Sequence, residues 1–493
     1  MAQDNPTQAD VNALMVLMQT GKYAEAESKC RKFIKRFPKV LGFYDTMSKA
    51  QIAQGNFRGV AKTLEKAIEI NPAFVDGEYN LGVAYMNINR LDKALATFTS
   101  VVSKRADFFD AYNNLGACYI ELQRFDEGLD AYAKAVDLKP DYVPALRNYG
   151  AALRDVGRLD EAEKILEKIP VLQPEFALGF LSLGVTKAKL EKMDEAAECL
   201  EQALKLEPEM REAHYELGKV FKYQGDMNKA LEHFEKVDSM IARVQVLELL
   251  HDMGNRDELL PRLKKLCDAE PKNLRAAAFS AYASHQYEMD NLHSFARDPM
   301  DLVSVSDLSD RLDYSPRMLT ELMLAADELT TVWQHATTRG GTQTHGNLFD
   351  PALQNEQFSK LEKLIRKELR GYREKFKDCP DGIINDFPRD FTLKGWRVKL
   401  MKAGFQKPHI HSGGWISGVL YLKIPKQIEG NEGSIAFSLH GYDYRKERDD
   451  IPYKEHAPSE GELILFPSSL FHWTIPFESD EERQCIAFDV VPA

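Results

Sequence analysis

The sequence has few cysteines and lacks any long hydrophobic run, and these two deficits exclude several classes of protein. No stretch of 18 apolar residues occurs, so we expect no membrane-spanning segment. Residues 1–5 have neither a basic start nor an apolar core, which argues against a secretory signal. The cysteines are spaced singly with no CxxC pair, which excludes a disulfide framework and a cysteine zinc site. We therefore expect a cytoplasmic protein with six reduced thiols: Cys30, Cys118, Cys199, Cys267, Cys379 and Cys485.

Basic residues are also too few for a general nucleic-acid-binding protein. The chain has 64 Lys and Arg against 76 Asp and Glu, a formal net charge of −12. A nucleic-acid binder would instead show a basic face, so no nucleic-acid partner is expected. The length of 493 residues exceeds one ordinary hydrophobic core and predicts two or three domains.

A period of 34 residues organises the N-terminal half of the chain. Leu-Gly pairs recur in phase with the prolines, and small residues precede several of the prolines by twelve positions. This pattern resembles the tetratricopeptide repeat, which implies two antiparallel helices per unit, with the proline ending the second helix. We predict an all-α solenoid over 1–290, with seven repeats, a degenerate eighth and a closing helix near 274–286. The prolines that mark the period are Pro38, Pro72, Pro140, Pro174 and Pro208.

Three asparagines occupy the same position in successive repeats: Asn80, Asn114 and Asn148. In repeat proteins of this kind that position faces the inside of the superhelix. A carboxamide both donates and accepts, so the three could hold an extended peptide by its backbone. The alternative is that each is solvated or bonds within its own repeat. We expect a protein or peptide partner on the concave face; repeat arrays also bind copies of themselves, which leaves both a monomer and a homodimer open.

The 34-residue period ends near residue 290, and the pattern of apolar residues and glycines then changes. A glycine-rich stretch at 338–349 lacks the Gly-Lys-Ser/Thr ending of a phosphate loop, and an amphipathic helix is expected over 358–376. Short apolar runs separated by Gly and Pro follow from residue 396, as in a jelly roll. We predict an α+β domain over 291–493, with a jelly-roll β core at about 391–493.

Three histidines and an arginine in this β region form a pattern with chemical meaning. His409 and His411 lie two residues apart, His472 follows 61 positions later, and Arg483 comes 11 positions after that. Jelly rolls can carry an open non-haem iron site built from two histidines and a carboxylate. Arg483 begins the last apolar run, where a fixed guanidinium can bind a carboxylate through two parallel hydrogen bonds.

The residues around these positions resemble one group of the 2-oxoglutarate/Fe(II)-dependent oxygenases, which have a double-stranded β-helix fold. The resemblance covers about residues 295–493. It implies that His409 and His472 bind Fe(II) and that Arg483 holds the distal carboxylate of 2-oxoglutarate. It also implies that 2-oxoglutarate and O₂ become succinate and CO₂ while a substrate C–H bond is oxidised. The matching motifs are His409-Ile410-His411, Ser417-Gly418-Val419-Leu420-Tyr421-Leu422, Leu465-Phe466-Pro467 through His472, and Arg483.

Two departures from the broad superfamily affect this interpretation. His411 stands where the superfamily has Asp, so a three-histidine site would leave the iron one negative charge short. Alternatively, His411 lies outside the coordination sphere, as in a two-histidine site of the aspartyl/asparaginyl β-hydroxylase kind, enzymes that also join helical repeats to an oxygenase domain. Cys485 stands where the superfamily often has Ser, and its thiol is a weaker hydrogen-bond partner.

Several readings stay open at the level of the sequence. Trp415 and Trp473 flank the histidines and either line a substrate pocket or pack in the core. The segment 442–456 either closes over a substrate or is a solvated loop. The main functional alternatives are a repeat scaffold with a catalytically silent cupin-like module, and a three-histidine dioxygenase that does not use 2-oxoglutarate. A zinc hydrolase is disfavoured because no HExxH spacing occurs.

Overall fold

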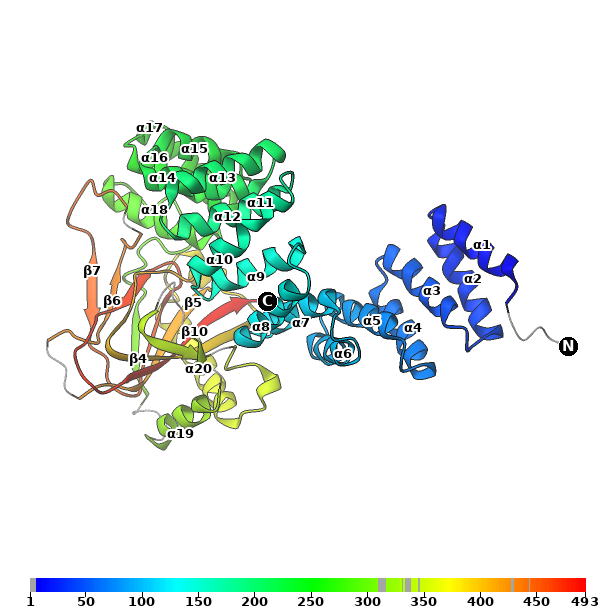
Figure 1. Ribbon diagram of the computed structural model, residues 1–493. Helices are drawn as coiled ribbons and strands as arrows, with labels where there is room; N and C mark the ends of the chain where they lie inside the picture. Colours follow the sequence, from blue (N-terminus) through cyan, green and yellow to red (C-terminus); the bar gives the residue numbers. More distant parts are fainter. Residues whose placement is uncertain are drawn as a thin grey trace. The chain divides into compact units, whose positions relative to one another are not determined.

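The chain divides into two compact units, Met1–His233 and Phe234–Ala493. Their secondary structure is drawn in Figure 1, which shows a computed structural model. In the described part of the chain, every helix is too short or too polar to cross a bilayer. The structure describes residues 6–308, 316–329, 331–332, 338–344, 346–426, 430–442 and 444–493.

Paired antiparallel helices build the first unit, as the 34-residue period predicts, and the prediction of a tetratricopeptide solenoid is confirmed (Figure 1). The small residues at the phased positions explain the close packing. Ala26, Ala94 and Ala162 are fully buried, and a Cβ added to Gly82 would lie 2.7 Å from the ring of Phe98. The helices are α1 Gln8–Gln19, α2 Tyr23–Arg36, α3 Leu41–Ala53, α4 Phe57–Ile70, α5 Val75–Asn87, α6 Leu91–Lys104, α7 Phe109–Glu121, α8 Phe125–Leu138, α9 Val143–Asp155, α10 Leu159–Leu166, α11 Lys168–Leu172, α12 Ala177–Lys189, α13 Met193–Leu206, α14 Arg211–Gln224 and α15 Met227–Glu235.

The second unit begins with the helices of the degenerate eighth repeat and the closing helix: α16 Met240–Asp252, α17 Arg256–Ala269 and α18 Leu274–Gln286. Leu274 and Ala277 of α18 lie in one hydrophobic core with Phe295 and with Ile416 of the sheet. Helix α18 therefore contributes to the core of the β domain, although its sequence continues the helical pattern of the repeats.

Two antiparallel sheets follow in the second unit, together with a few helices, which confirms the predicted jelly-roll architecture. The larger sheet has the strand order β1-β8-β5-β10-β4-β3-β2, and the smaller one the order β7-β6-β9. The strands are β1 Ser304–Asp307, β2 Thr331–Val332, β3 Thr338–Thr344, β4 Phe391–Gln406, β5 Ile416–Lys423, β6 Ile435–Ser438, β7 Tyr453–His456, β8 Glu462–Pro467, β9 Phe471–Thr474 and β10 Arg483–Pro492.

The two faces of the larger sheet bury different neighbours. On β5, Ile416 and Leu420 belong to a core that includes helix α20 (Glu356–Lys375) and helix α19 (Pro316–Asp327). The alternate residues Val419 and Tyr421 belong to a second core with Ile435 of the smaller sheet. Because successive side chains of a strand point to opposite faces, this alternation places a helical layer on one face and the smaller sheet on the other. The short elements η2 Pro351–Leu353 and α21 Gly382–Asn385 complete the unit.

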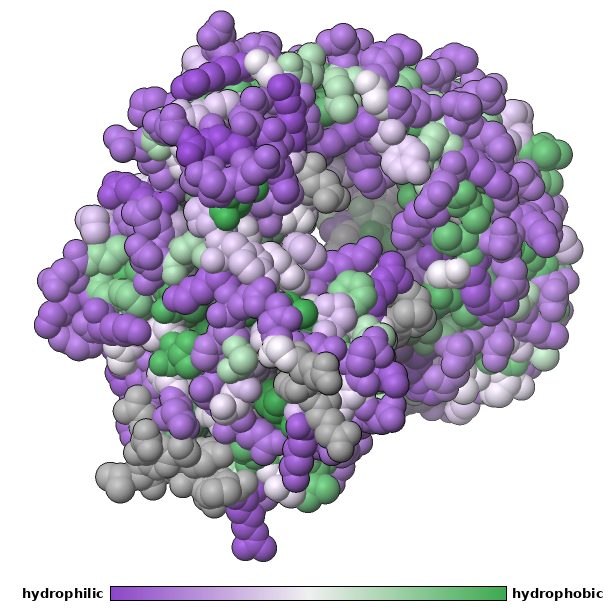
Figure 2. All heavy atoms as spheres, turned by 90° about the vertical axis from the view of Figure 1, so that its left-hand side faces the viewer, coloured by the Kyte–Doolittle hydropathy of each residue, from purple (hydrophilic) through white to green (hydrophobic). Residues whose placement is uncertain are grey.

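The surface on the side of β6 and β7 is mostly hydrophilic, with hydrophobic residues scattered among the polar ones (Figure 2). This distribution agrees with the high charged content of the sequence, 28%. The concave features that reach the interior of the β domain therefore stand out as candidate sites.

The shared core of α18 and the sheet can be tested by truncating a core leucine. We expect Leu274→Ala to lower the free energy of unfolding of the second unit by about 2–5 kcal/mol, the usual cost of such a cavity. All four tryptophans of the chain, at positions 333, 396, 415 and 473, belong to the second unit, so tryptophan fluorescence during urea unfolding reports on it alone. Leu324→Ala on α19 is the control because Leu324 is 62% exposed. Equal effects of the two substitutions would show that α18 folds independently of the sheet.

Candidate metal centre

Three predicted histidines converge between the two sheets. His472 lies on β9, and His409 follows the end of β4. The two residues form an antiparallel backbone bridge, in which His409 N–H donates to His472 O at 3.2 Å and His472 N–H donates to His409 O at 3.1 Å. The His411 N–H donates to Ser468 O at 3.0 Å. One nitrogen from each ring lies within 4.8 Å of the others, which is a spacing that a single metal ion can bridge.

Hydrogen bonds fix which ring nitrogen of each histidine is free. The Nδ1 of His409 faces Lys407 O at 2.7 Å, and the Nδ1 of His472 faces Leu470 O at 3.1 Å. The Nδ1 of His411 faces Asp489 Oδ1 at 2.6 Å. Carbonyl and carboxylate oxygens only accept, so each Nδ1 carries the proton and each Nε2 keeps a free lone pair. The Nε2 atoms are therefore the potential metal ligands.

The surroundings keep two of these rings neutral. Burial lowers the pKa of His409 to about 4, with a further lowering from the neighbouring His411. Burial and the neighbouring His409 likewise hold the pKa of His472 well below its usual value. A metal competes with protons for an imidazole, so rings that stay neutral at pH 7 are suited to bind one.

Asp489 is a site residue that the sequence reasoning missed. It lies on β10 and also accepts a hydrogen bond from Ser417 Oγ at 2.7 Å, which in turn contacts Ser468 Oγ at 2.8 Å. A carboxylate bonded to the distal nitrogen of a ligating histidine orients the ring and raises its basicity. The signal in the sequence is one acidic residue within the otherwise apolar run 485–491, but its pairing with a residue 78 positions away is visible only in the fold.

Arg483 begins β10 and is buried, with 2% of its surface exposed. Its Nε donates to Gly433 O at 3.0 Å, and its guanidinium lies over the ring of Tyr421 at 4.9 Å. Its contact with Cys485 Sγ, at 3.8 Å, is long and weak. Among the described residues, no carboxylate forms an ion pair with Arg483. The guanidinium is therefore buried without a counter-ion, and some of its N–H groups remain available to a ligand.

A hydroxyl group beside Arg483 is also unsatisfied. Tyr421 Oη is buried and has no partner in hydrogen-bond geometry within the described residues. The Tyr421 ring lies against the Arg483 guanidinium, and both residues line the same cavity. Buried polar groups are nearly always paired, so an unpaired hydroxyl beside a buried cation suggests a position for a bound anion.

A narrow cavity joins the histidines to Arg483, and an open groove continues outward from it. The groove has a volume of about 770 Å³ and shares Trp396, Gln406, His409 and His411 with the cavity. The remaining cavity residues are Ser417, Gly418, Val419, Tyr421, Ile435, Phe466, His472, Trp473, Thr474, Arg483, Cys485 and Ala487.

The other sequence-predicted residues differ in where they lie. Trp473 lines the cavity. Trp415 packs in the core instead, where its indole N–H donates to Ile383 O at 2.9 Å and its ring meets that of Phe295. It is not among the residues that line the cavity or the groove.

Two of the three repeat asparagines bond to side chains of adjacent repeats. Asn114 Nδ2 donates to Tyr79 Oη at 3.1 Å, and Asn148 Nδ2 donates to Asn113 Oδ1 at 3.0 Å. Asn80 is half-buried and forms no such bond with the described residues. The carboxamides of Asn114 and Asn148 are therefore partly engaged, and peptide binding by the three asparagines stays a prediction.

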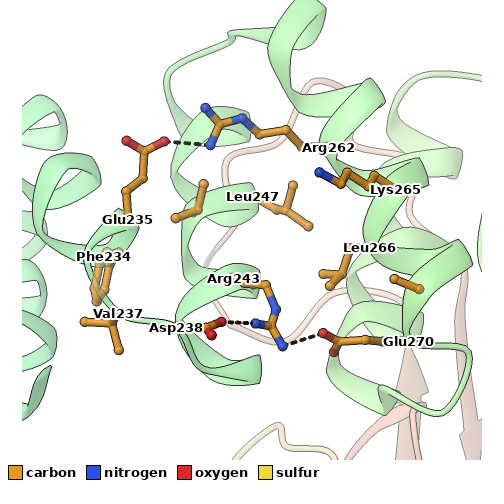
Figure 3. Close-up of a pocket in the computed structure, with 12 residues that line it drawn as sticks. Phe234, Glu235, Val237, Asp238, Arg243, Leu247, Arg262, Lys265, Leu266 and Glu270 are labelled. Carbon is orange, nitrogen blue, oxygen red and sulfur yellow. Dashed lines mark hydrogen bonds and ion pairs between the residues drawn. The ribbon is translucent and has the colours of Figure 1, made fainter.

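A further groove of about 760 Å³ lies among α16, α17 and residues 234–238 (Figure 3). Its lining includes the apolar side chains of Leu247 and Leu266, and ion pairs connect charged residues around them. Arg243 bridges Asp238 and Glu270, each at 2.5 Å, and Arg262 pairs with Glu235 at 2.6 Å (Figure 3). The lining contains no histidine or cysteine, so the groove has no metal-binding group of those types.

Protein-family models match both the repeat region and the C-terminal region of the chain. Residues 394–489 match the family described as "Putative 2OG-Fe(II) oxygenase". Tetratricopeptide-repeat models match residues 46–107, 79–143, 119–178, 184–225 and 212–243. The chain thus carries tetratricopeptide repeats and, over residues 394–489, a region that matches this oxygenase family. A search of curated proteins found no match to the chain.

Three of the solved structures similar to this chain are described as tetratricopeptide-repeat proteins. A tetratricopeptide repeat protein from Parabacteroides merdae is 16% identical over 49% of this chain and 97% of its own, with a TM-score of 0.41. YrrB, described as a TPR protein with an unusual peptide-binding site, is 23% identical over 37% of this chain and 96% of its own, with a TM-score of 0.33. TTC0263 from Thermus thermophilus is 23% identical over 36% of this chain and 98% of its own, with a TM-score of 0.31.

The role of Asp489 can be measured by metal affinity. We expect Asp489→Asn to weaken binding of Fe(II) or Co(II) about 10- to 100-fold, because an amide holds the His411 ring less firmly and adds no negative charge. Competition with a coloured chelator under anaerobic conditions gives the affinity. Asp480→Asn is the matched control, since the Asp480 side chain is 92% exposed. Unchanged affinity in Asp489→Asn would exclude His411 as a metal ligand supported by this carboxylate.

Proposed function

We propose that this protein is a 2-oxoglutarate- and Fe(II)-dependent oxygenase that hydroxylates a protein or peptide. The observation that carries the proposal is the buried guanidinium of Arg483, which has no carboxylate partner among the described residues and opens into the same cavity as three converging histidines. A buried charge is costly unless an opposite charge accompanies it, so this site favours an anionic ligand.

2-Oxoglutarate has the negative charge that this arrangement favours. Its distal carboxylate would accept from the remaining guanidinium donors of Arg483 and from the unsatisfied hydroxyl of Tyr421. Its other end would then point toward the histidines along the shared cavity. The catalytically silent module is disfavoured, because such a module has no need to maintain a buried, unpaired arginine.

The donor set also fits Fe(II). His409 and His472 would hold the metal through Nε2, and His411 would be the third protein ligand, oriented by Asp489. Bound Fe(II) would supply the capacity to activate O₂ with electrons from 2-oxoglutarate and so to oxidise a C–H bond. The protein's own groups would bind and orient the cosubstrate, keep the imidazoles of His409 and His472 neutral, and enclose the site between two sheets.

The repeats suggest the class of acceptor. Solenoids of this kind are scaffolds for other polypeptides, so the first unit would recruit the protein that is hydroxylated. Asn80, Asn114 and Asn148 remain candidate contacts for it. All six cysteines are free, which supports a reducing compartment such as the cytoplasm.

The first experiment adds Fe(II) and 2-oxoglutarate to the full-length protein without oxygen and records the visible charge-transfer band of the chelate. We expect a band in the wild type and none in His472→Ala or Arg483→Ala, because one removes a metal ligand and the other the carboxylate anchor. Bound iron without a band would favour a three-histidine dioxygenase that uses no 2-oxoglutarate. A protein that binds no iron would be a scaffold.

Substitution of Tyr421 gives a second test, in which we expect stability to be kept or raised while 2-oxoglutarate affinity falls. The Tyr421 hydroxyl is buried and unpaired, so Tyr421→Phe should leave the stability of the ligand-free protein equal or higher. It should nevertheless weaken 2-oxoglutarate binding several-fold, since it removes one donor to the distal carboxylate. Titration of the charge-transfer band gives the affinity, and urea unfolding gives the stability.

Tyr372→Phe is the matched control for that experiment. Tyr372 is equally buried, but its hydroxyl donates to Leu302 O at 2.7 Å outside the cavity. We expect this substitution to cost about 1 kcal/mol of stability and to leave 2-oxoglutarate affinity unchanged. The same response in both variants would remove Tyr421 from the proposed binding site.

A further inference from the structure

The backbone beside the metal centre has an edge without a backbone partner. His409 exchanges both its N–H and its C=O with His472 of β9. The N–H and C=O of the next residue, Ile410, point the other way, as alternate residues of an antiparallel pair do. Within the described residues, neither group has a backbone partner. The N–H interacts instead with the side chain of Tyr442. An edge without a backbone partner is a template for an added strand.

The open groove lies along this edge. Its lining includes Pro408 and Ile410 on one side, and Trp396 and Tyr442 provide two aromatic surfaces. The groove also contains His409 and His411, so a chain lying in it would pass directly by the metal ligands. Aromatic rings and a free backbone edge together suit an extended peptide better than a small polar metabolite.

Tyr442 is held in place from behind by a side chain of helix α18. The guanidinium of Arg275 lies over its ring at 5.2 Å, and the ring of Phe471 meets it edge-on at 4.7 Å. Arg275 pairs in turn with Glu248 of α16 at 3.1 Å, and Glu248 is only 2% exposed. Glu248 also accepts hydrogen bonds from Gln245 at 2.7 Å and from Tyr444 at 3.3 Å. One buried polar network thus connects two helices to the wall of the groove.

The segment that follows Tyr442 is fixed by the same helices. The carbonyl of Arg445 accepts from His251 Nε2 at 2.7 Å and from Tyr282 Oη at 2.6 Å. Gln286 Oε1 accepts from the backbone N–H groups of Glu447 at 2.7 Å and Arg448 at 2.9 Å. The charged side chains here are largely exposed, as a solvated loop predicts, but the backbone is anchored to α16 and α18. The groove wall is therefore preorganised.

We propose that an extended segment of the acceptor protein binds as an added strand along Pro408–His411, against Tyr442, and that Arg275 is the positioning residue for this wall. This inference rests on the proposed function, because the added strand matters for catalysis only if it presents a residue to a bound metal. It gives α16 and α18 a specific part in substrate binding: they hold Tyr442 against the groove.

The orientation of the Tyr442 hydroxyl sharpens the proposal. Burial raises the pKa of Tyr442, whereas the Arg275 charge and a hydrogen bond from the Ile410 N–H lower it in part. The phenol oxygen is therefore a side-chain partner of this N–H. A substrate carbonyl that bonds to Ile410 N–H would take the place of this oxygen. The ring is thus expected to favour peptide binding while the hydroxyl competes with it.

The experiment uses the full-length protein and a synthetic library of end-blocked random decapeptides. The tightest binder selected on the immobilised wild type is labelled with fluorescein, and its Kd is measured by anisotropy for each variant. We expect Tyr442→Ala and Arg275→Ala to raise the Kd at least about tenfold, the loss of one aromatic anchor. Tyr442→Phe should bind as well as the wild type or better, and Arg275→Lys should retain most of the affinity.

Two controls separate the groove from other peptide-binding surfaces. Tyr223→Ala removes a tyrosine that is 64% exposed on α14 and should leave the Kd unchanged. A variant with Asn80, Asn114 and Asn148 all changed to Ala tests the concave face of the repeats. A Kd that depends on the asparagines and not on Tyr442 would overturn the proposal, as would a library that yields no binder.

Metal and cosubstrate measurements distinguish failure of this inference from failure of the proposed function. The charge-transfer band and the uncoupled formation of succinate should stay within about twofold of the wild type in the Tyr442 and Arg275 variants, since neither residue is a ligand. A normal band with a Kd that is insensitive to Tyr442→Ala would refute the inference alone. No band in the wild type, with a Kd that still depends on Tyr442, would refute the oxygenase and leave a peptide-binding groove.

Discussion

The site depends on a cation that the fold buries without a counter-ion. Arg483 is held by a backbone carbonyl and by the face of an aromatic ring, and neither neutralises it. Removing a guanidinium from water in this way is expensive, so the free energy of the folded sheet must sustain it. A dicarboxylate would recover part of that cost when it binds. The same reasoning explains the unpaired hydroxyl of Tyr421, which a ligand oxygen would satisfy.

Strand β10 links the two charged ends of the site. Arg483, Cys485, Ala487 and Asp489 alternate along it and so share one face, toward the smaller sheet. In the proposed oxygenase the cation at its start would bind the cosubstrate, while the carboxylate near its end accepts a hydrogen bond from His411. A divalent metal, one arginine, one aspartate and a dianionic cosubstrate would together be neutral. Asp489 would therefore supply the negative charge that is missing when histidine replaces the usual aspartate ligand.

Much of this architecture follows from the sequence, because periodic patterns and short motifs are local. The 34-residue period predicts the helix pairs, and the spacing of His409, His472 and Arg483 predicts a site in a jelly roll. The pairing of Asp489 with His411 depends on strand register between distant segments, which the sequence does not display. Trp415 illustrates a second limit. An aromatic residue beside a histidine motif can pack in the core or line the pocket, and the local sequence pattern is the same in both cases. The anchoring of residues 445–448 by His251, Tyr282 and Gln286 is likewise a product of tertiary packing.

The core that α18 shares with the sheet constrains how this protein can evolve. Each repeat of such an array packs mainly on its neighbours, so whole 34-residue units can be gained or lost within Met1–His233 while the packing between repeats is kept. Helices α16 and α18 do not have this freedom, because their side chains fill the core of the second unit or anchor its loop. Recombination that exchanges one repeat array for another would therefore have to join the chains upstream of α16. A lineage could in this way change the protein that it recruits while keeping its catalytic unit intact.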